Sequence, residues 1–225
     1  MLFDLFHTLV SVPNPALAGE LRIAEQLGVS ELEWQRRYYD EDVYGRCVGR
    51  VTDGFEAMRL VAHSIDPTVP DARIRSALAS RRRRFEIGLV QIEPGILAAV
   101  DRLRAAGIRT VVVSDAGADD VESWPRSPLS SRFDAVIFSY AIGVRKPDSR
   151  IYRRALEAVD ARSIDALFVG DGGSEEHQGA RAVGLRTVLV TRLLSYYRSE
   201  VIEARRAHAD WEFADVPAFV GALEL

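Results

Sequence analysis

The sequence predicts an α/β fold: a Rossmann-like, doubly wound parallel sheet with an inserted all-helical unit. Five short apolar runs predict strands, helical patterns separate the last four of them, and one long stretch is helical without strands. Strands that alternate with helices are typical of a parallel sheet covered by helices on both faces.

The predicted strands are mostly continuous in apolar residues, as expected for strands that are buried on both faces of a parallel sheet. They are Leu2–Phe3, Ile108–Val113, Ala135–Ser139, Ala166–Val169 and Arg186–Val190. The first is a stub because only three residues precede Asp4. Either the sheet tolerates this or the natural start lies upstream.

Helices are predicted between the later strands, with glycine marking two of their ends. They are Ile96–Ala106, with Gly107 as a C-cap, Ile151–Val159, and Glu176–Val183, which Gly184 stops. Trp211 and Phe213 are interpreted as packing of the final segment.

Residues 13–93 interrupt this alternation and predict a helical insert, which leaves residues 1–12 and 94–225 for the sheet. Prolines flank the insert, at Pro13 and Pro15 on one side and Pro94 on the other. Its helical patterns are Leu17–Leu27, Glu31–Val43, Gly54–Ser64 and Ile74–Phe85.

Composition restricts the class of partner. A net charge of −4 argues against a nucleic-acid partner, and no apolar run is long enough for a membrane span. The start lacks the pattern of a signal peptide, and a single cysteine, Cys47, is typical of a reducing compartment, so we expect a cytoplasmic protein. The basic run Arg81–Arg84 is interpreted as a solvated helix face, the alternative being attraction of an anionic substrate.

Polar residues follow four of the predicted strands. Asp4 follows the first and Ser114 and Asp115 the second, Lys146 lies in the loop after the third, and Asp171 follows the fourth. Lys146 is the only lysine beside 28 arginines. Because ligands bind at the carboxyl ends of strands in such sheets, this convergence predicts a site.

These residue types suit phosphoryl transfer. A carboxylate can attack phosphorus and form an aspartyl-phosphate, which splits one difficult step into two. Two converging acids call for a cation, and hard oxygen ligands beside a phosphate suit Mg²⁺. Lys146 would neutralise charge on the transferring group, and Ser114 would bind a phosphate oxygen.

The chain resembles the haloacid dehalogenase superfamily, in its branch with a helical cap after the first strand. Four motifs occur in family order: the Asp4 loop through Thr8-Leu9, Val111–Ser114, Lys146-Pro147, and Gly170-Asp171 with Glu175, Glu176 and Gly179-Ala180. The resemblance implies that Asp4 is the nucleophile, that Ser114 and Lys146 bind the phosphoryl group, and that residues 13–93 are the cap. Asp115 is a further candidate substrate-binding residue. The resemblance also implies a Mg²⁺ site made by Asp4, the carbonyl of Phe6, Asp171, and Glu175 or Glu176. The expected substrate is a small phosphorylated metabolite, and the expected state is a monomer or homodimer.

One position departs from the family's phosphatases. They carry an acid–base Asp two residues after the nucleophile, where this chain has Phe6. We therefore expect slow turnover or a preference for good leaving groups. The adjacent His7 offers a substitute, but it is interpreted as a loop residue that points elsewhere.

Two alternatives remain open. Metal-independent 2-haloacid dehalogenases also have an aromatic residue at the position of Phe6. They use asparagine in two motifs, however, where this chain has Asp115 and Asp171, and its sole asparagine, Asn14, lies elsewhere. A non-catalytic phosphate-binding or regulatory protein is the other alternative. Phosphonate hydrolysis is rejected because the insert contains no lysine.

Aromatic residues gather in the insert at Trp34, Tyr38, Tyr39 and Tyr44, with Arg37 and Arg46 between them. Their roughly helical spacing favours a core role, and the alternative is the lining of a substrate pocket.

Overall fold

The structure is a computed structural model that describes residues 1–12, 20–194 and 199–225. Pro13, Asn14, Pro15 and the beginning of the predicted helix Leu17–Leu27 lie outside the described residues.

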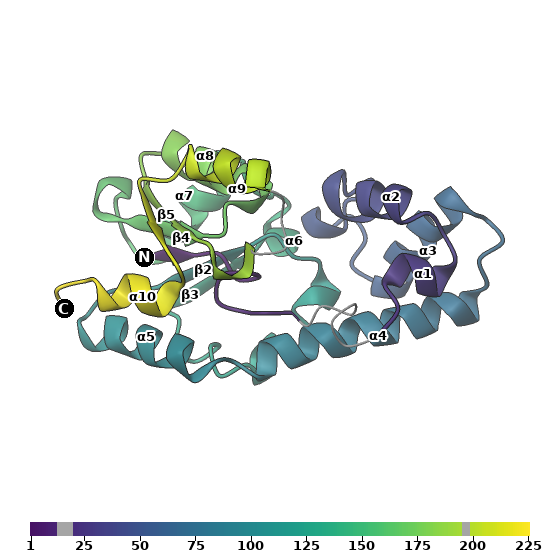
Figure 1. The fold of residues 1–225 in the computed structure, drawn as a ribbon, viewed down its shortest axis with the longest axis horizontal. Helices are drawn as coiled ribbons and strands as arrows, with labels where there is room; N and C mark the ends of the chain where they lie inside the picture. The colour runs from purple at the N-terminus through teal and green to yellow at the C-terminus, as the bar shows by residue number, and fades with distance from the viewer. Residues whose placement is uncertain (13–19, 195–198) are drawn as a thin grey trace.

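A parallel sheet forms the centre of the larger part of the molecule (Figure 1). Its strand order is β3-β2-β1-β4-β5-β6, and every neighbouring pair is parallel. The strands are β1 (Leu2–Phe3), β2 (Val111–Ser114), β3 (Ala135–Phe138), β4 (Leu167–Gly170), β5 (Arg186–Val190) and β6 (Trp211–Phe213). The predicted α/β class is confirmed, and the two-residue β1 pairs on both sides, with β2 and β4.

The sixth strand corrects our interpretation of Trp211 and Phe213 as mere packing. Backbone pairing places Trp211 opposite Val188 and Phe213 opposite Val190. Phe213 packs against the core, whereas Trp211 is 43% exposed. A three-residue strand at the edge of the sheet shows no continuous apolar run, so the pattern that revealed the central strands is missing here.

Helices cover both faces of the sheet (Figure 1). One core cluster joins Val112 and Val188 of the sheet to α5 (Pro94–Ala105) and α10 (Val216–Gly221). A second joins Val111 and Phe168 to α7 (Ser149–Glu157) and α8 (Glu176–Ala182). The remaining helices of this part are α6 (Ser139–Ile142) and α9 (Ser199–Arg206).

A helical unit stands beside the sheet and has a core of its own (Figure 1). It contains α1 (Ile23–Leu27), α2 (Glu31–Trp34), the π-helix Gln35–Asp40, the 3₁₀ turn Arg46–Val48, α3 (Gly54–Ile65) and α4 (Asp71–Val90). Trp34 and Tyr38 stack in this core, with ring centroids 4.6 Å apart, as the favoured interpretation of the aromatic residues predicts.

A buried group of four charges joins the helical unit to the sheet. Arg46 and Arg81 of the helical unit pair with Asp119 and Asp120, which lie in a 3₁₀ turn after β2. All four side chains are at most 6% exposed. We call this group the interface tetrad. It corrects the interpretation of Arg81–Arg84 as a solvated face, because only Arg82 and Arg83 are exposed.

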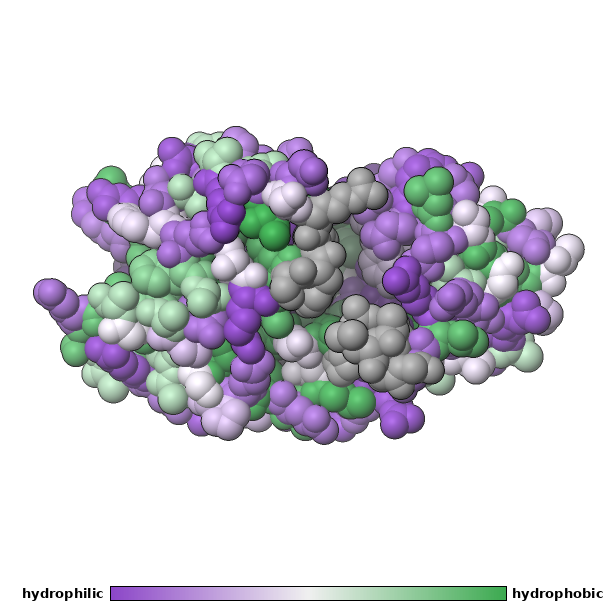
Figure 2. Space-filling view, in the orientation of Figure 1, coloured by the Kyte–Doolittle hydropathy of each residue, from purple (hydrophilic) through white to green (hydrophobic). Residues whose placement is uncertain are grey.

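The surface is hollowed between the sheet on the left and the helical unit on the right of Figure 2, and hydrophilic residues predominate over the helical unit. Among the described residues, no helix combines the length and the apolar character needed to span a bilayer.

Candidate active site

The carboxyl ends of three neighbouring strands place polar side chains together. Asp4 follows β1 and donates its backbone N–H to the carbonyl of Val169 in β4 (2.9 Å). Ser114 ends β2, and Asp171 follows β4. Because β1 lies between β2 and β4, these residues meet at one edge of the sheet, as the sequence pattern predicts.

Lys146 is the centre of the charge network. Its Nζ donates to Asp4 Oδ1 and to Glu176 Oε2, both at 2.6 Å, and its side chain is 3% exposed. The second oxygen of Asp4 accepts from Thr8 Oγ1 at 2.9 Å. Burial acts to lower the pKa of Lys146, but the surrounding carboxylates hold it well above its usual value, so the ammonium stays charged.

Ser114 and Asp115 lie beside this network with unsatisfied polar atoms. Ser114 Oγ is buried, and within the described chain no group hydrogen-bonds to it. Asp115 accepts the backbone N–H of Lys146 through Oδ1 (2.9 Å), which ties the lysine loop to the end of β2. Its Oδ2 is also without a described partner, and burial raises the pKa of this carboxyl. Both side chains are positioned to bind an added polar group.

Three buried carboxylates form a potential cation site. One oxygen from each of Asp4, Asp171 and Glu176 lies within 4.8 Å of the others. Burial raises the pKa of Asp4 and Glu176, and repulsion from Asp171 adds to the effect, although Lys146 opposes it. Hard oxygen donors that repel one another are suited to a divalent cation.

The backbone before α8 distinguishes the two adjacent glutamates. Ser174 and Glu175 both have positive φ (52° and 51°), so the chain turns sharply there. Glu175 is exposed on this turn, whereas Glu176, the first residue of α8, is fully buried and also accepts the N–H of Gly172 at 2.7 Å. The sequence left this choice open, and the geometry brings only Glu176 to the cluster.

The loop after Asp4 carries Phe6 and His7 on the cavity wall. The ring of Phe6 packs edge-on against Phe85 of α4, with centroids 5.1 Å apart. His7 has a positive φ of 66° and lines both neighbouring cavities, and its buried Nδ1 has no described partner. The expectation that His7 points away is therefore wrong.

No sequence pattern indicated Arg205 on α9. Its Nη1 donates to Asp171 at both the carboxylate Oδ2 (2.7 Å) and the backbone carbonyl (2.8 Å). Nothing in the run Glu203–Arg206 distinguishes this arginine from the other 27, and it follows the last recognisable motif.

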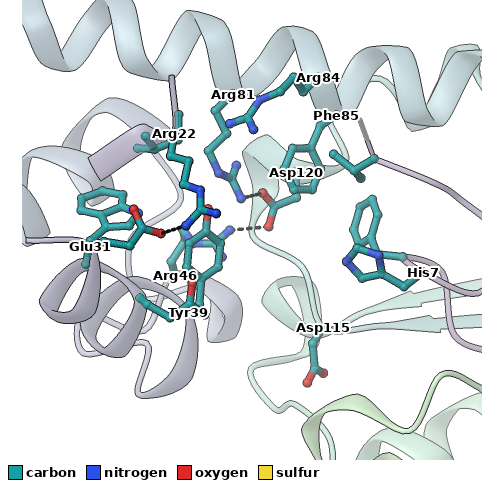
Figure 3. Close-up of a pocket in the computed structure, with 15 residues that line it drawn as sticks. His7, Arg22, Glu31, Tyr39, Arg46, Arg81, Arg84, Phe85, Asp115 and Asp120 are labelled. Atoms are coloured by element: carbon teal, nitrogen blue, oxygen red, sulfur yellow. Dashed lines mark hydrogen bonds and ion pairs between the residues drawn. The ribbon is translucent and has the colours of Figure 1, made fainter. Parts of the chain in front are cut away.

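Two cavities adjoin at this edge of the sheet. The Asp4 cavity, of about 580 Å³, contains the residues described above and is also lined by Arg145 and by the helical unit's Asp40 and Cys47. A second cavity, of about 430 Å³, lies against α4 and shares five lining residues with the first: Phe6, His7, Tyr39, Arg46 and Asp115. Figure 3 shows this second cavity, which we call the arginine chamber. Both volumes are in the range of small-molecule sites.

Comparisons with known proteins agree with this geometry. The sequence model for haloacid dehalogenase-like hydrolases matches residues 1–184. The protein CbbY of Rhodobacter capsulatus is 26% identical over 97% of this chain and 93% of its own length. The ribulose-1,5-bisphosphate 5-phosphatase of Halopiger xanaduensis is 27% identical over 84% of this chain and 83% of its own length.

The fold has a counterpart among solved structures. The crystal structure of a dehalogenase superposes with a TM-score of 0.65 and 18% identity, covering 100% of this chain and 96% of that one. This likeness concerns the fold, whereas the family match covers most of the chain and includes the strand ends that carry Asp4, Ser114, Lys146 and Asp171. The chain therefore belongs to the haloacid dehalogenase-like hydrolases.

Proposed function

We propose that this hydrolase is a Mg²⁺-dependent phosphatase that acts on small phosphorylated metabolites through an aspartyl-phosphate on Asp4. The observation that carries the proposal is Ser114 Oγ, a buried hydroxyl without a described partner in the cavity that also holds Asp4 and Lys146. A phosphoryl oxygen would satisfy this hydroxyl and the lysine together. The relatives above support it, since one is named for dephosphorylating a sugar bisphosphate.

The donor set fits a divalent cation. One carboxylate oxygen from each of Asp4, Asp171 and Glu176 lies within 4.8 Å of the others, and such a cluster of hard oxygen donors suits Mg²⁺. Asp4, Asp171 and Glu176 would hold the ion, together with the carbonyl of Phe6 that the family resemblance implies. When bound, the ion would neutralise charge on the transferring phosphoryl group.

The residues of the chain divide the reaction between them. Asp4 attacks phosphorus, a bond forms from its carboxylate oxygen to phosphorus, and the bond to the leaving oxygen breaks. Lys146 and Ser114 hold the phosphoryl group in place, and Asp115 positions the lysine loop through the backbone N–H of Lys146. Water then attacks phosphorus and loses a proton, which releases phosphate and restores the carboxylate of Asp4.

Proton transfer in both steps is assigned to His7, because Phe6 cannot exchange a proton. His7 occupies a left-handed backbone conformation that glycine adopts without strain. A residue held in such a conformation on a cavity wall is a candidate for function. The side chain lines the Asp4 cavity, where its imidazole would exchange a proton with the leaving group and with water.

The helical unit is proposed as the cap of this enzyme, corresponding to residues 13–93. Tyr39, Asp40 and Arg46 bring it to the wall of the Asp4 cavity, and a cover of this kind excludes water from the reacting groups.

Dehalogenation and pure ligand binding are the competing functions. The aromatic Phe6 on the cavity wall favours a dehalogenase. Against it, Asp115 and Asp171 line the same cavity and would repel the carboxylate of a haloacid. A non-catalytic role has less support, because the attacking carboxylate, the lysine and the acidic cluster are all in contact.

The test is turnover of p-nitrophenyl phosphate with and without Mg²⁺. We expect Mg²⁺-dependent release of p-nitrophenol that falls by about 10³-fold or more in Asp4→Asn. Asp101→Asn removes a surface carboxylate that pairs with Arg132 and serves as the matched control. Metal-independent chloride release from 2-chloropropionate would instead identify a dehalogenase. Mg²⁺-dependent phosphate binding without turnover would identify a binding protein.

A further inference from the structure

The arginine chamber extends the Asp4 cavity toward the helical unit. Phe6, His7 and Asp115 lie in the wall that the two cavities share, next to the attacking carboxylate and the phosphoryl-binding Ser114. Because the two cavities share this wall, the chamber is a neighbouring space for the rest of a substrate whose phosphoryl group sits on Ser114 and Lys146.

Arginines dominate the polar wall of the chamber, and most of them have carboxylate partners. Arg46 and Arg81 are neutralised within the interface tetrad, as the dashed contacts to Asp120 in Figure 3 show. Arg22 lies 4.0 Å from Glu31 at the exposed rim. These three guanidinium groups already have counter-ions.

Arg84 is the exception. It is half-buried, its Nε is inaccessible to solvent, and none of the described residues forms an ion pair or hydrogen bond with it. Arg81 lies one turn earlier on α4, so the two side chains share a helix face, and both project from that helix in Figure 3. The carboxylates of the interface tetrad are committed to Arg46 and Arg81, which leaves Arg84 uncompensated.

A partly buried arginine without a counter-ion raises the free energy of the folded protein unless an anion binds to it. Burial is the largest cause of a lowered pKa for Arg84, Arg81 adds to it, and Tyr39 and Glu20 do not compensate. A partly desolvated cation without a partner is unfavourable, and its planar fork matches a carboxylate or a phosphate.

We propose, on the basis of the phosphatase function above, that Arg84 binds a second anionic group of the substrate. The substrate class is then a small phosphate monoester that carries a carboxylate or another phosphate at its far end. Phe85 and Tyr39 also line the arginine chamber. A monoester with a neutral far end leaves Arg84 unpaired and binds more weakly.

Binding of phosphonates tests this independently of turnover. The probes are 4-carboxybenzylphosphonate and its neutral analogue 4-carbamoylbenzylphosphonate, titrated calorimetrically into the full chain with Mg²⁺. A third probe, 1,4-xylylenebisphosphonate, distinguishes a distal phosphate-like group from a carboxylate. We expect one or both doubly anionic probes to bind about tenfold or more tightly than the amide. Arg84→Gln should abolish that preference.

Arg83→Gln is the matched control, since Arg83 is the exposed neighbour on the same helix, and this variant should keep the preference. Equal affinity of the wild-type protein for all three probes would overturn the proposal. So would a preference that survives in Arg84→Gln. A preference that depends on Arg84 in a protein that hydrolyses no phosphate ester would support the anion site and reject the phosphatase function.

Discussion

At the scale of single residues, Phe6 stands where the family's phosphatases carry the acid–base Asp. This enzyme therefore needs another group to transfer protons. The ring of Phe6 is engaged with Phe85 and belongs to the wall between the two cavities. The nearest group in sequence that exchanges protons is His7, which lines the same wall.

His7→Gly separates the chemistry of this residue from its effect on folding. Glycine adopts the φ of 66° without strain, so the free energy of unfolding should stay the same or rise by up to about 1 kcal/mol. We expect kcat/KM for an alkyl phosphate, whose leaving group needs a proton, to fall by about 10²-fold. The value for p-nitrophenyl phosphate should change far less. Equal losses for the two substrates, or none, would exclude His7 as the proton donor.

The sequence predicts most of the charged residues at the sheet edge because their position follows from topology. Asp4 and Asp171 directly follow strands, Ser114 ends β2, Lys146 lies in the loop beyond β3, and parallel strands end at one edge. Arg205 could not be predicted, because its contact with Asp171 depends on how α9 packs, which no local sequence pattern encodes.

At the scale of elements, α4 connects the helical unit to the turn that follows β2. Arg81 extends from this helix to Asp119 and Asp120, and Arg46 reaches the same pair from its 3₁₀ turn. Burial acts to raise the pKa of Asp120, but the charges of the two arginines outweigh it and lower the pKa to about 2. The ionised carboxylate is therefore part of the folded state at neutral pH.

Asp120→Asn should destabilise the protein by about 3–5 kcal/mol at pH 7, because two buried guanidinium groups lose a counter-ion. Asp120 has a lower pKa in the folded protein than the ordinary value of 3.8, so its contribution is present above that value. The difference between mutant and wild type should shrink as pH falls from 3.8 toward 2.

Urea denaturation at several pH values measures this difference. Glu122→Gln, which breaks an exposed pair with Arg82 at 3.5 Å, is the control and should cost less than about 1 kcal/mol. A loss for Asp120→Asn no larger than that of the control would show that the tetrad adds nothing to stability.

Strands and helices were predicted correctly where burial imposes a continuous pattern of apolar residues on the sequence. The predicted strand Arg186–Val190 coincides with β5, and the predicted helix Ile151–Val159 overlaps α7. The predicted helix Glu31–Val43 is in fact α2 followed by the π-helix Gln35–Asp40, a change of hydrogen-bonding that apolar periodicity does not report.

At the scale of the whole molecule, the helical unit must approach the sheet closely enough to complete the cavities. Gly49, which follows the 3₁₀ turn Arg46–Val48, marks one such approach. It has a φ of +72°, and a Cβ atom there would lie 2.2 Å from the carbonyl oxygen of Tyr140 in α6. This contact has no room for a side chain.

Gly49→Ala should therefore push the helical unit away from the sheet. Gly107→Ala is the matched control because Gly107 has a φ of +73° with nothing within 4 Å of its virtual Cβ atom. Both variants carry the left-handed strain of about 1–2 kcal/mol. Gly49→Ala should lose about 1–3 kcal/mol more and lower kcat/KM for p-nitrophenyl phosphate, whereas Gly107→Ala should keep wild-type activity. Equal stability and activity in the two variants would show that the close approach is unimportant.

The two-residue strand β1 has a consequence for the order in which the protein folds. Leu2 pairs with Val111 on one side and Phe168 on the other, so this strand is synthesised long before either of its neighbours. The helical unit, with its own core, is complete in sequence before either partner strand has been synthesised. During translation the helices can therefore collapse early, while Leu2 and Phe3 stay unpaired until β2 emerges and gain their second neighbour only when β4 follows. Such long-range pairing slows folding and lengthens the time for which an apolar segment is exposed to other chains.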